Sequence, residues 1–191
     1  MSQASNREIR KIRRLQNFYN AIPNLVWSAL SLVPITVFCY QSMSPKWFWI
    51  FLGLSFLPLF FPNILLDKLQ IGRSTKIYKK LGVHFINRIA QNGEFVNRLI
   101  RKRFPDHKVV SFDKKSSNRL VAQTYVFEKF HLMLFIFFTL AAIYAFAHHF
   151  SGWAWLFILT NILYNVYPNL LQQYIRVKLR IYNRISARKS A

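Results

Sequence analysis

Hydrophobic residues gather in four long runs along the chain, and the charged residues lie between these runs. The runs cover about 21–40, 47–66, 131–147 and 153–171, and none of them contains Asp, Glu, Lys or Arg. A helix needs roughly 20 apolar residues to cross a bilayer, so each run suits one membrane span, and the third is near the short limit. The pattern predicts an all-α integral membrane protein with four transmembrane helices in a single membrane domain, residues 1–191.

The segments outside the runs carry amphipathic patterns. Residues 1–19 place apolar side chains at intervals of three among basic ones, which predicts an amphipathic helix on the inner membrane surface. Residues 67–130 form a cytoplasmic interfacial segment, and residues 172–191 form a basic cytoplasmic tail. Within the interfacial segment, residues 75–104 predict two short interfacial helices, with one apolar face over Ile77, Leu81, Phe85 and Ile89 and a turn at Asn92-Gly93. A loop is expected over 105–118.

The basic residues are distributed on one side of the predicted membrane. The chain has 27 Lys and Arg residues and a formal net charge of +21. Only Lys46 falls in a connection that would be extracellular, and the other basic residues fall in the two terminal segments and the central one. The positive-inside rule therefore predicts a multi-pass membrane protein with both termini in the cytoplasm, which in a bacterium would be a protein of the inner membrane. The same charge should attract anionic membrane lipids.

Several functional classes do not fit this composition. The basic residues flank apolar runs instead of forming a separate basic domain, so nucleic acid is not an expected partner. Cys39 is the single cysteine, which leaves neither a disulfide framework nor a thiolate metal site. The first run is longer than a signal-peptide core and lacks a small-residue cleavage pattern after it, so we expect an uncleaved anchor. No metal and no bound cofactor are expected.

A polar stripe runs through the fourth apolar stretch and into the basic tail. Asn161, Asn165, Pro168, Gln172 and Arg176 recur at spacings of three and four, which places them within about 80° on one helix face. A membrane helix with a single polar stripe turns it toward a partner helix or a cavity.

Topology brings a second polar group to the same side of the membrane. Glu128 and His131 are three residues apart at the cytoplasmic end of the third span, and Gln172, Tyr174 and Arg176 leave the antiparallel fourth span there. A neutral histidine can take a proton from a hydroxyl while a carboxylate orients it, and amides with an arginine can stabilise an oxyanion.

A purely structural interpretation of these residues stays open. Glu128 could pair with Lys129 or Arg176, His131 could be an interfacial side chain, and the stripe could hold helices together. Asp67 is expected to be a solvated partner of Lys68, or alternatively an acid or a metal ligand at the mouth of the site. Glu-x-x-His alone is a weak motif, and the chain lacks H-E-x-x-H, H-x4-D and Gly-rich phosphate loops.

Three fragments of the sequence resemble a known family. They are Tyr78-x-x-Leu81-Gly82-Val83, Glu128-x-x-His131, and Asn165-x-x-Pro168-x-x-x-Gln172-x-Tyr174-x-Arg176-x-Lys178-Leu179. Together they resemble the glycosyl-4,4'-diaponeurosporenoate acyltransferase family, small bacterial membrane proteins named for the enzyme that attaches a fatty acyl chain to a glycosylated carotenoid. The resemblance covers roughly residues 75–180.

The resemblance and the residues together give a functional hypothesis. The protein would transfer a fatty acyl group to a hydroxyl of a glycolipid or a glycosylated isoprenoid or carotenoid, with acyl-CoA or acyl carrier protein as donor. His131 would be the general base and Glu128 its orienting carboxylate; the substrate-binding residues would be Asn161, Asn165, Gln172, Tyr174 and Arg176. The alternative is a non-enzymatic lipid-binding or assembly subunit of a membrane pathway, and a transporter is less favoured. Membrane lipids are expected partners, and an oligomer is compatible with the sequence.

Overall fold

The computed structural model describes residues 3–83 and 114–189, and this part of the chain is helical without strands. The long helices are α1 (Gln3–Gln41), α7 (Lys114–Ala147) and α9 (Tyr167–Lys189). The shorter elements are α2 (Pro45–Ser55), the 3-10 helix η1 (Leu57–Phe60), α3 (Asn63–Lys68), α4 (Thr75–Lys80), α8 (Ser151–Asn161) and the π-helical turn η2 (Ile162–Val166).

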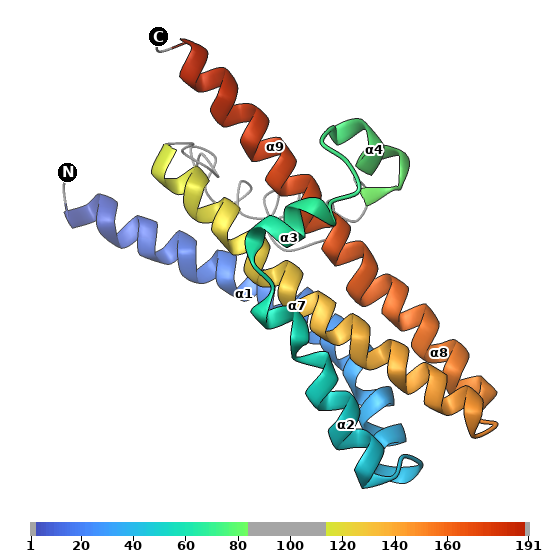
Figure 1. The fold of residues 1–191 in the computed structure, drawn as a ribbon. Coiled ribbons are helices and arrows are strands. Elements are labelled where there is room, and N and C mark those ends of the chain that lie inside the picture. Colours follow the sequence, from blue (N-terminus) through green and yellow to red (C-terminus); the bar gives the residue numbers. More distant parts are fainter. Residues whose placement is uncertain (1–2, 84–113, 190–191) are drawn as a thin grey trace.

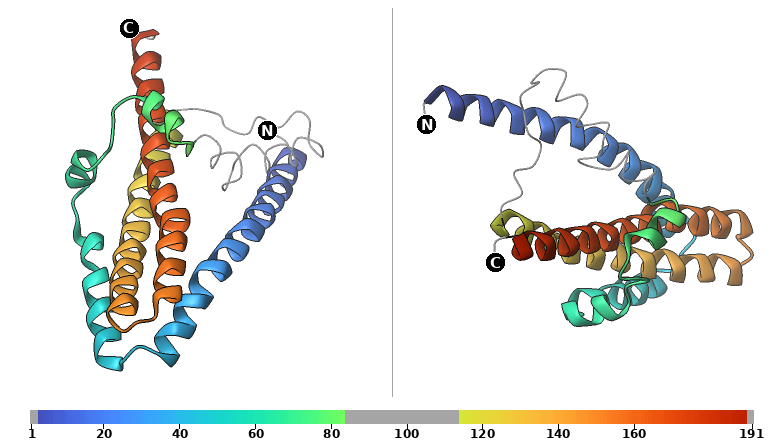
Figure 2. Two further views of the ribbon diagram at one scale, coloured as in Figure 1. Left: turned by 90° about the vertical axis from the view of Figure 1, so that its right-hand side faces the viewer. Right: turned by 90° about the horizontal axis from the view of Figure 1, so that it is seen from above.

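The helix α7 is the centre of the arrangement. It packs along α8 and α9 on one side and against α2 and η1 on another, while α1 touches α8 near its C-terminal end and diverges from the bundle toward its N-terminus (Figures 1 and 2). The turn between α1 and α2 and the turn between α7 and α8 lie at one end of the bundle (Figure 1). Both chain termini lie at the opposite end.

Two of the described helices are long and apolar enough to cross a membrane. These stretches are Asn17–Gln41 and Ser117–Ala147, and Pro45–Phe60 is a shorter apolar helical stretch. The sequence predicted four such helices, so the described residues show two of them in full length. The other two predicted spans are present as apolar segments, but each is interrupted.

The second predicted span, 47–66, is wrong as a continuous helix. It consists of α2, η1 and α3, with breaks at Phe56 and at Phe61-Pro62. Pro58 and Pro62 have no backbone N–H to continue the ladder and clash with the preceding turn, so the helix ends before each of them. The fourth predicted span, 153–171, consists of α8, the π turn η2 and the start of α9. The π turn interrupts the regular α-helical hydrogen bonding, but the three elements follow one another without a gap.

Two helices extend further than the sequence predicted. The amphipathic segment 1–19 and the first span 21–40 are joined in the single helix α1, which continues through Pro23 and Pro34. The helix α7 begins at Lys114, inside the predicted loop 105–118.

The predicted face through Ile77, Leu81, Phe85 and Ile89 is wrong in its described part. The helix α4 ends at Lys80, and Gly82 adopts a left-handed conformation with φ of 76°. This backbone conformation suits glycine and terminates the helix. The second interfacial helix and the Asn92-Gly93 turn lie outside the described residues.

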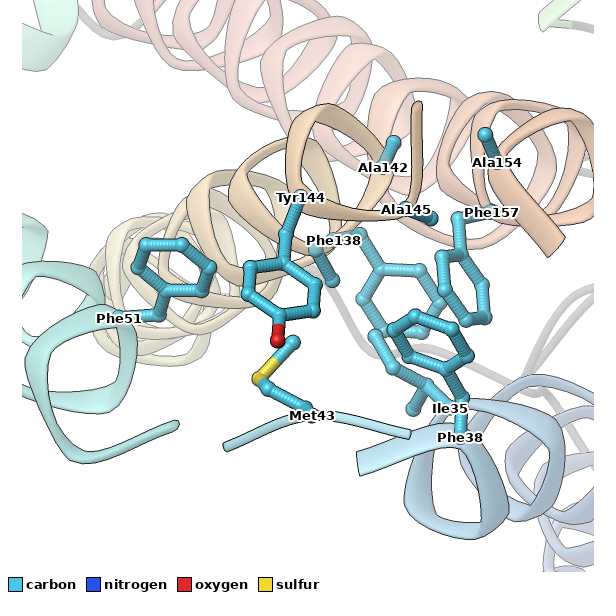
Figure 3. Packing of buried hydrophobic residues seen from close by; sticks show 11 residues of the cluster. Ile35, Phe38, Met43, Phe51, Phe138, Ala142, Tyr144, Ala145, Ala154 and Phe157 are labelled. Atoms are coloured by element: carbon cyan, nitrogen blue, oxygen red, sulfur yellow. The ribbon is translucent and has the colours of Figure 1, made fainter. Parts of the chain in front are cut away.

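An apolar core joins α1, α2, α7 and α8 at the hairpin end of the bundle. Phe38 of α1 is fully buried and its ring contacts Tyr144, Phe150, Trp153 and Phe157. Figure 3 shows the side chains of these helices packed together. The small residues Ala142, Ala145 and Ala154 allow the backbones of α7 and α8 to approach closely.

We predict that Phe38→Ala destabilises the protein by about 3 kcal/mol or more, because it removes a fully buried aromatic side chain and leaves a cavity. Tyr40, two residues further along the same helix, is 91% exposed, so Tyr40→Ala is the matched control and should leave stability unchanged. Thermal unfolding of both purified variants in the same detergent compares them. Equal losses in the two variants would contradict this packing.

Candidate functional site

A buried ion pair joins α7 to α9. The Arg176 side chain is 0% exposed and that of Glu128 is 1% exposed, and Arg176 Nη1 lies 2.5 Å from Glu128 Oε2. A buried charge is tolerated only with a close partner and further hydrogen bonds. Arg176 also lies over the ring of Tyr125, with its guanidinium carbon 4.4 Å from the ring centre, which is a favourable contact for a cation.

Gln173 connects this ion pair to the segment between α3 and α4. Its Nε2 donates to Glu128 Oε1 over 2.8 Å, and its Oε1 accepts from the backbone N–H of Ile71 over 3.2 Å. The buried hydroxyl of Tyr78 donates to the carbonyl of Gly72 over 2.9 Å and lies 3.3 Å from Gln173 Oε1. The segment from Ile71 to Tyr78 is thereby held against α9.

Asp67 is the third charged residue of this group, and it lies nearer to the protein surface than Glu128. It accepts a hydrogen bond from the Tyr125 hydroxyl, pairs with Arg180 at 2.9 Å, and lies 3.3 Å from Arg176 Nε. Burial by itself would raise the pKa of Asp67, but the hydrogen bonds from Arg180 and Tyr125 and the two positive charges outweigh it, and the pKa is lowered. The expected pairing of Asp67 with Lys68 is not what the structure shows.

These side chains are called the Arg176 network: Asp67, Tyr125, Glu128, Gln173, Arg176 and Arg180. Its two carboxylates balance its two guanidinium groups, so the burial of Arg176 leaves no net charge inside the protein. The network joins α3, α7 and α9.

The π turn η2 changes which polar residues face α7. Asn161 and Asn165 are buried as the predicted stripe requires, but beyond η2 the buried polar side chains are Asn169, Gln173 and Arg176. Pro168 and Gln172 are only half-buried. Asn161, Asn165, Asn169 and Gln173 are each four residues apart, and in an α-helix three such steps move a side chain about 120° around the helix axis. A π turn, whose hydrogen bonds span five residues, is wider and offsets part of this rotation. Gln173 therefore takes the place predicted for Gln172.

The buried asparagines form a hydrogen-bond chain with a fixed direction. Asn161 Nδ2 donates to the carbonyl of Phe135 over 3.1 Å and to Thr139 Oγ1 over 3.0 Å, and Asn165 Nδ2 donates to Asn161 Oδ1 over 2.8 Å. Because a backbone carbonyl can only accept, the orientation of each amide follows from the first bond. The chain therefore ends on an acceptor, Asn165 Oδ1.

Three buried polar atoms near this end make no close hydrogen bond among the described residues. They are Asn165 Oδ1, Asn169 Oδ1 and His131 Nδ1. The His131 imidazole lies within longer hydrogen-bonding reach of the Asn165 side chain and the Tyr164 backbone, and its ring makes an edge contact with the Tyr164 ring at 5.8 Å between centres. We call these three residues the acceptor cluster. Buried polar groups are normally satisfied, so atoms of this kind indicate a missing partner.

The structure does not bring Glu128 and His131 together in the predicted way. Both side chains are described, and the carboxylate of Glu128 is hydrogen-bonded to Arg176 and Gln173 and not to the imidazole. The prediction that Glu128 orients His131 is corrected accordingly. Tyr174, which the sequence predicted as a substrate-binding residue, is buried beside Tyr78, Leu170 and Val177.

Sequence reasoning missed Gln173, Asn169, Tyr125 and Arg180. Gln173 is adjacent to the predicted Gln172 and escaped because a straight helix was assumed. Tyr125 could have been found from its spacing of three before Glu128. Within the described residues, 3–83 and 114–189, no group of three or more His, Cys, Asp and Glu side chains could hold a metal ion.

We predict that Glu128→Leu destabilises the protein by about 3 kcal/mol, because it leaves the Arg176 charge buried with only the more distant Asp67. The double variant Glu128→Leu/Arg176→Leu should regain most of this loss, since it removes both charges. Unfolding of the two single variants and the double variant measures the coupling. Strictly additive losses would show that the pair is not coupled.

Asp67 gives the network a dependence on pH. Its pKa in the folded protein lies below the ordinary value of 3.8, so its stabilising contribution is present above that value and is lost as the pH falls through the folded-state pKa. Melting temperatures from about pH 7 to about pH 3 should show Asp67→Asn less stable than wild type at neutral pH, with the difference closing in acid. Lys68→Gln, at the exposed neighbouring position, should keep the wild-type profile.

Comparison with known proteins shows which family the sequence belongs to. No curated protein and no solved structure matches the chain significantly. Residues 62–184 match a family model described as glycosyl-4,4'-diaponeurosporenoate acyltransferase, and the Arg176 network and the acceptor cluster both lie wholly within that range. The match covers well over half of the sequence and confirms the resemblance seen in the three fragments. The chain belongs to the glycosyl-4,4'-diaponeurosporenoate acyltransferase family.

Proposed function

We propose that the protein transfers a fatty acyl group to a hydroxyl of a glycolipid or a glycosylated isoprenoid at the acceptor cluster. The observation that carries this proposal is the group of buried polar atoms on His131, Asn165 and Asn169 that make no close hydrogen bond among the described residues. A molecule with several hydroxyl groups supplies the matching donors. Membership of an acyltransferase family supports the same reaction class.

In this proposal His131 is the general base. Its neutral imidazole accepts the proton of the acceptor hydroxyl as that oxygen attacks the acyl carbonyl of a thioester. The carbon–sulfur bond then breaks, and the proton passes to the leaving thiolate, so the products are an ester and a thiol. Asn165 and Asn169 accept hydrogen bonds from neighbouring hydroxyls and orient the acceptor.

The Arg176 network has a positioning role in the same proposal. Its charges are paired with one another, so Glu128 and Arg176 hold α9 against α7 and keep Asn165 and Asn169 facing His131. The exposed Lys178, Arg184 and Arg188 on the outer part of α9 give an anionic donor, acyl-CoA or acyl carrier protein, a favourable approach.

We further propose the four-span arrangement in the bacterial inner membrane. The α2–η1–α3 segment and the α8–η2–α9 segment would complete the crossings begun by α1 and α7. Both helical turns lie at one end of the bundle and both termini at the other (Figure 1), which supports cytoplasmic termini together with the distribution of basic residues.

A second candidate is a non-enzymatic lipid-binding or assembly subunit. The ion pair of Glu128 with Arg176 Nη1 favours it, because groups engaged with each other need no substrate to explain them. The two candidates differ in their dependence on His131, because only the enzyme needs its imidazole to take a proton from the acceptor hydroxyl.

We predict that His131→Gln abolishes acyl transfer while the protein remains folded. Mass spectrometry of lipid and pigment extracts from the native host would compare wild type, deletion, His131→Gln and the control His148→Gln at matched protein level; His148 is exposed at the hairpin turn. A product heavier by one fatty acyl group should appear with wild type and His148→Gln and fall on the order of 100-fold or more with His131→Gln. Unchanged extracts in all strains would favour the assembly subunit.

A further inference from the structure

A groove between α7 and α8 is not used by the proposal above. It has a volume of about 260 Å³ and lies along the seam of the two helices. Its lining is Phe135, Thr139, Ala142, Ile143, Phe146 and Ile158, together with Asn161 and Ile162. Ala142 is buried between larger side chains, and its small size helps leave the space open.

The polar atoms at the groove are already bonded inside the protein. Thr139 Oγ1 donates to the carbonyl of Phe135, Asn161 Nδ2 donates to that carbonyl and to Thr139, and Asn161 Oδ1 accepts from Asn165. The hydroxyl hydrogen of Thr139 and both amide hydrogens of Asn161 are thus used inside the protein, and no side-chain donor of these two residues is left for a ligand. The surface that the groove presents is therefore hydrocarbon, and an occupant must be apolar along its length.

The groove begins one helical turn from the acceptor cluster on both of its helices. Phe135 follows His131 by four residues on α7, and Asn161 precedes Asn165 by four, and residues at this spacing are neighbours on a helix. From there the groove extends toward the hairpin, as far as Phe146 and Ile158. A molecule with its reactive end at His131 has this apolar path directly beyond it.

We propose that the groove holds the fatty acyl chain that is transferred, with its carbonyl at His131 and its tail toward the α7–α8 hairpin. This inference rests on the proposed acyl transfer and names the residues that select the chain. If a methylene takes roughly the 30 Å³ of a water molecule, the groove accommodates on the order of eight or nine methylenes. The narrow space between two packed helices suits an unbranched chain, and longer chains continue past Phe146.

The chain-length profile of the product tests the groove. Ile143 is 59% exposed, so Ile143→Trp fills the far half of the groove without disturbing the core. It should shift the acylated product toward shorter chains, by about fourfold for each methylene excluded. Phe146→Ala should shift it toward longer chains. Leu159→Trp is the matched control, because Leu159 is 55% exposed and lies outside the groove.

A labelling experiment keeps the groove testable apart from catalysis. Purified full-length protein in lipid nanodiscs would be exposed to palmitoyl-CoA with a diazirine near the chain end, and separately to a phosphatidylcholine with the same photoreactive chain. We expect the thioester probe to label the segment around Ile143 and Phe146, excess palmitoyl-CoA to compete, and Ile143→Trp to reduce the labelling. Equal, uncompeted labelling by the phospholipid would identify ordinary bilayer lipid and overturn the inference.

The two experiments separate the two proposals. Acyl transfer with a chain-length profile unchanged by Ile143→Trp and Phe146→Ala, or labelling at other residues, overturns the groove and leaves acyl transfer standing. Absence of any acylated product, combined with competed labelling at Phe146, overturns acyl transfer and supports the groove as an acyl-thioester binding site.

Discussion

The burial of Arg176 is the constraint on which the half of the bundle near the chain termini depends. A guanidinium group with no exposure requires compensating charge, which comes from Glu128 on α7 and Asp67 on α3. The Tyr125 ring of α7 packs against it, and Gln173 of α9 bonds to Glu128. Each element must be in place for the charge to be tolerated. The ion pair therefore fixes the relation of α3, α7 and α9 more sharply than apolar packing between them could.

The π turn has the second largest effect on the site. It lies between the asparagines that face the apolar half of α7 and the residues that face Glu128, and it adjusts the rotation of α9 so that both groups share one seam. The wider turn keeps Asn161, Asn165, Asn169 and Gln173 on the buried side although they are each four residues apart. π turns of this kind occur frequently at functional sites, and here the turn adjoins the acceptor cluster.

Structural and chemical roles are separated along the seam of α7 with α8 and α9. At the end near the chain termini the buried charges of Glu128 and Arg176 are paired, and at the hairpin end aromatic and small side chains pack together. Between these two ends lie the buried acceptors of His131, Asn165 and Asn169 and the start of the apolar groove. A polar group next to an apolar groove matches an amphipathic substrate, which is the kind of molecule that an enzyme modifying glycosylated lipids must bind.

The sequence by itself determined the helical class, the apolar segments and the residues that carry chemistry, because these follow from composition and from helical spacing. It indicated that Glu128, His131, Asn165 and Arg176 meet, since a short hairpin makes the third and fourth apolar segments antiparallel neighbours. Only the tertiary structure decided the partners within that group. Glu128 could bond to His131 or to Arg176, and either Gln172 or Gln173 could face it. The choice depends on small rotations of the helices about their axes and on a π turn whose hydrogen bonds no local sequence pattern predicts. Asp67 joins the same network because the segment after Pro62 packs against α9, where Asp67 contacts Arg180, a residue more than 100 positions away in the sequence.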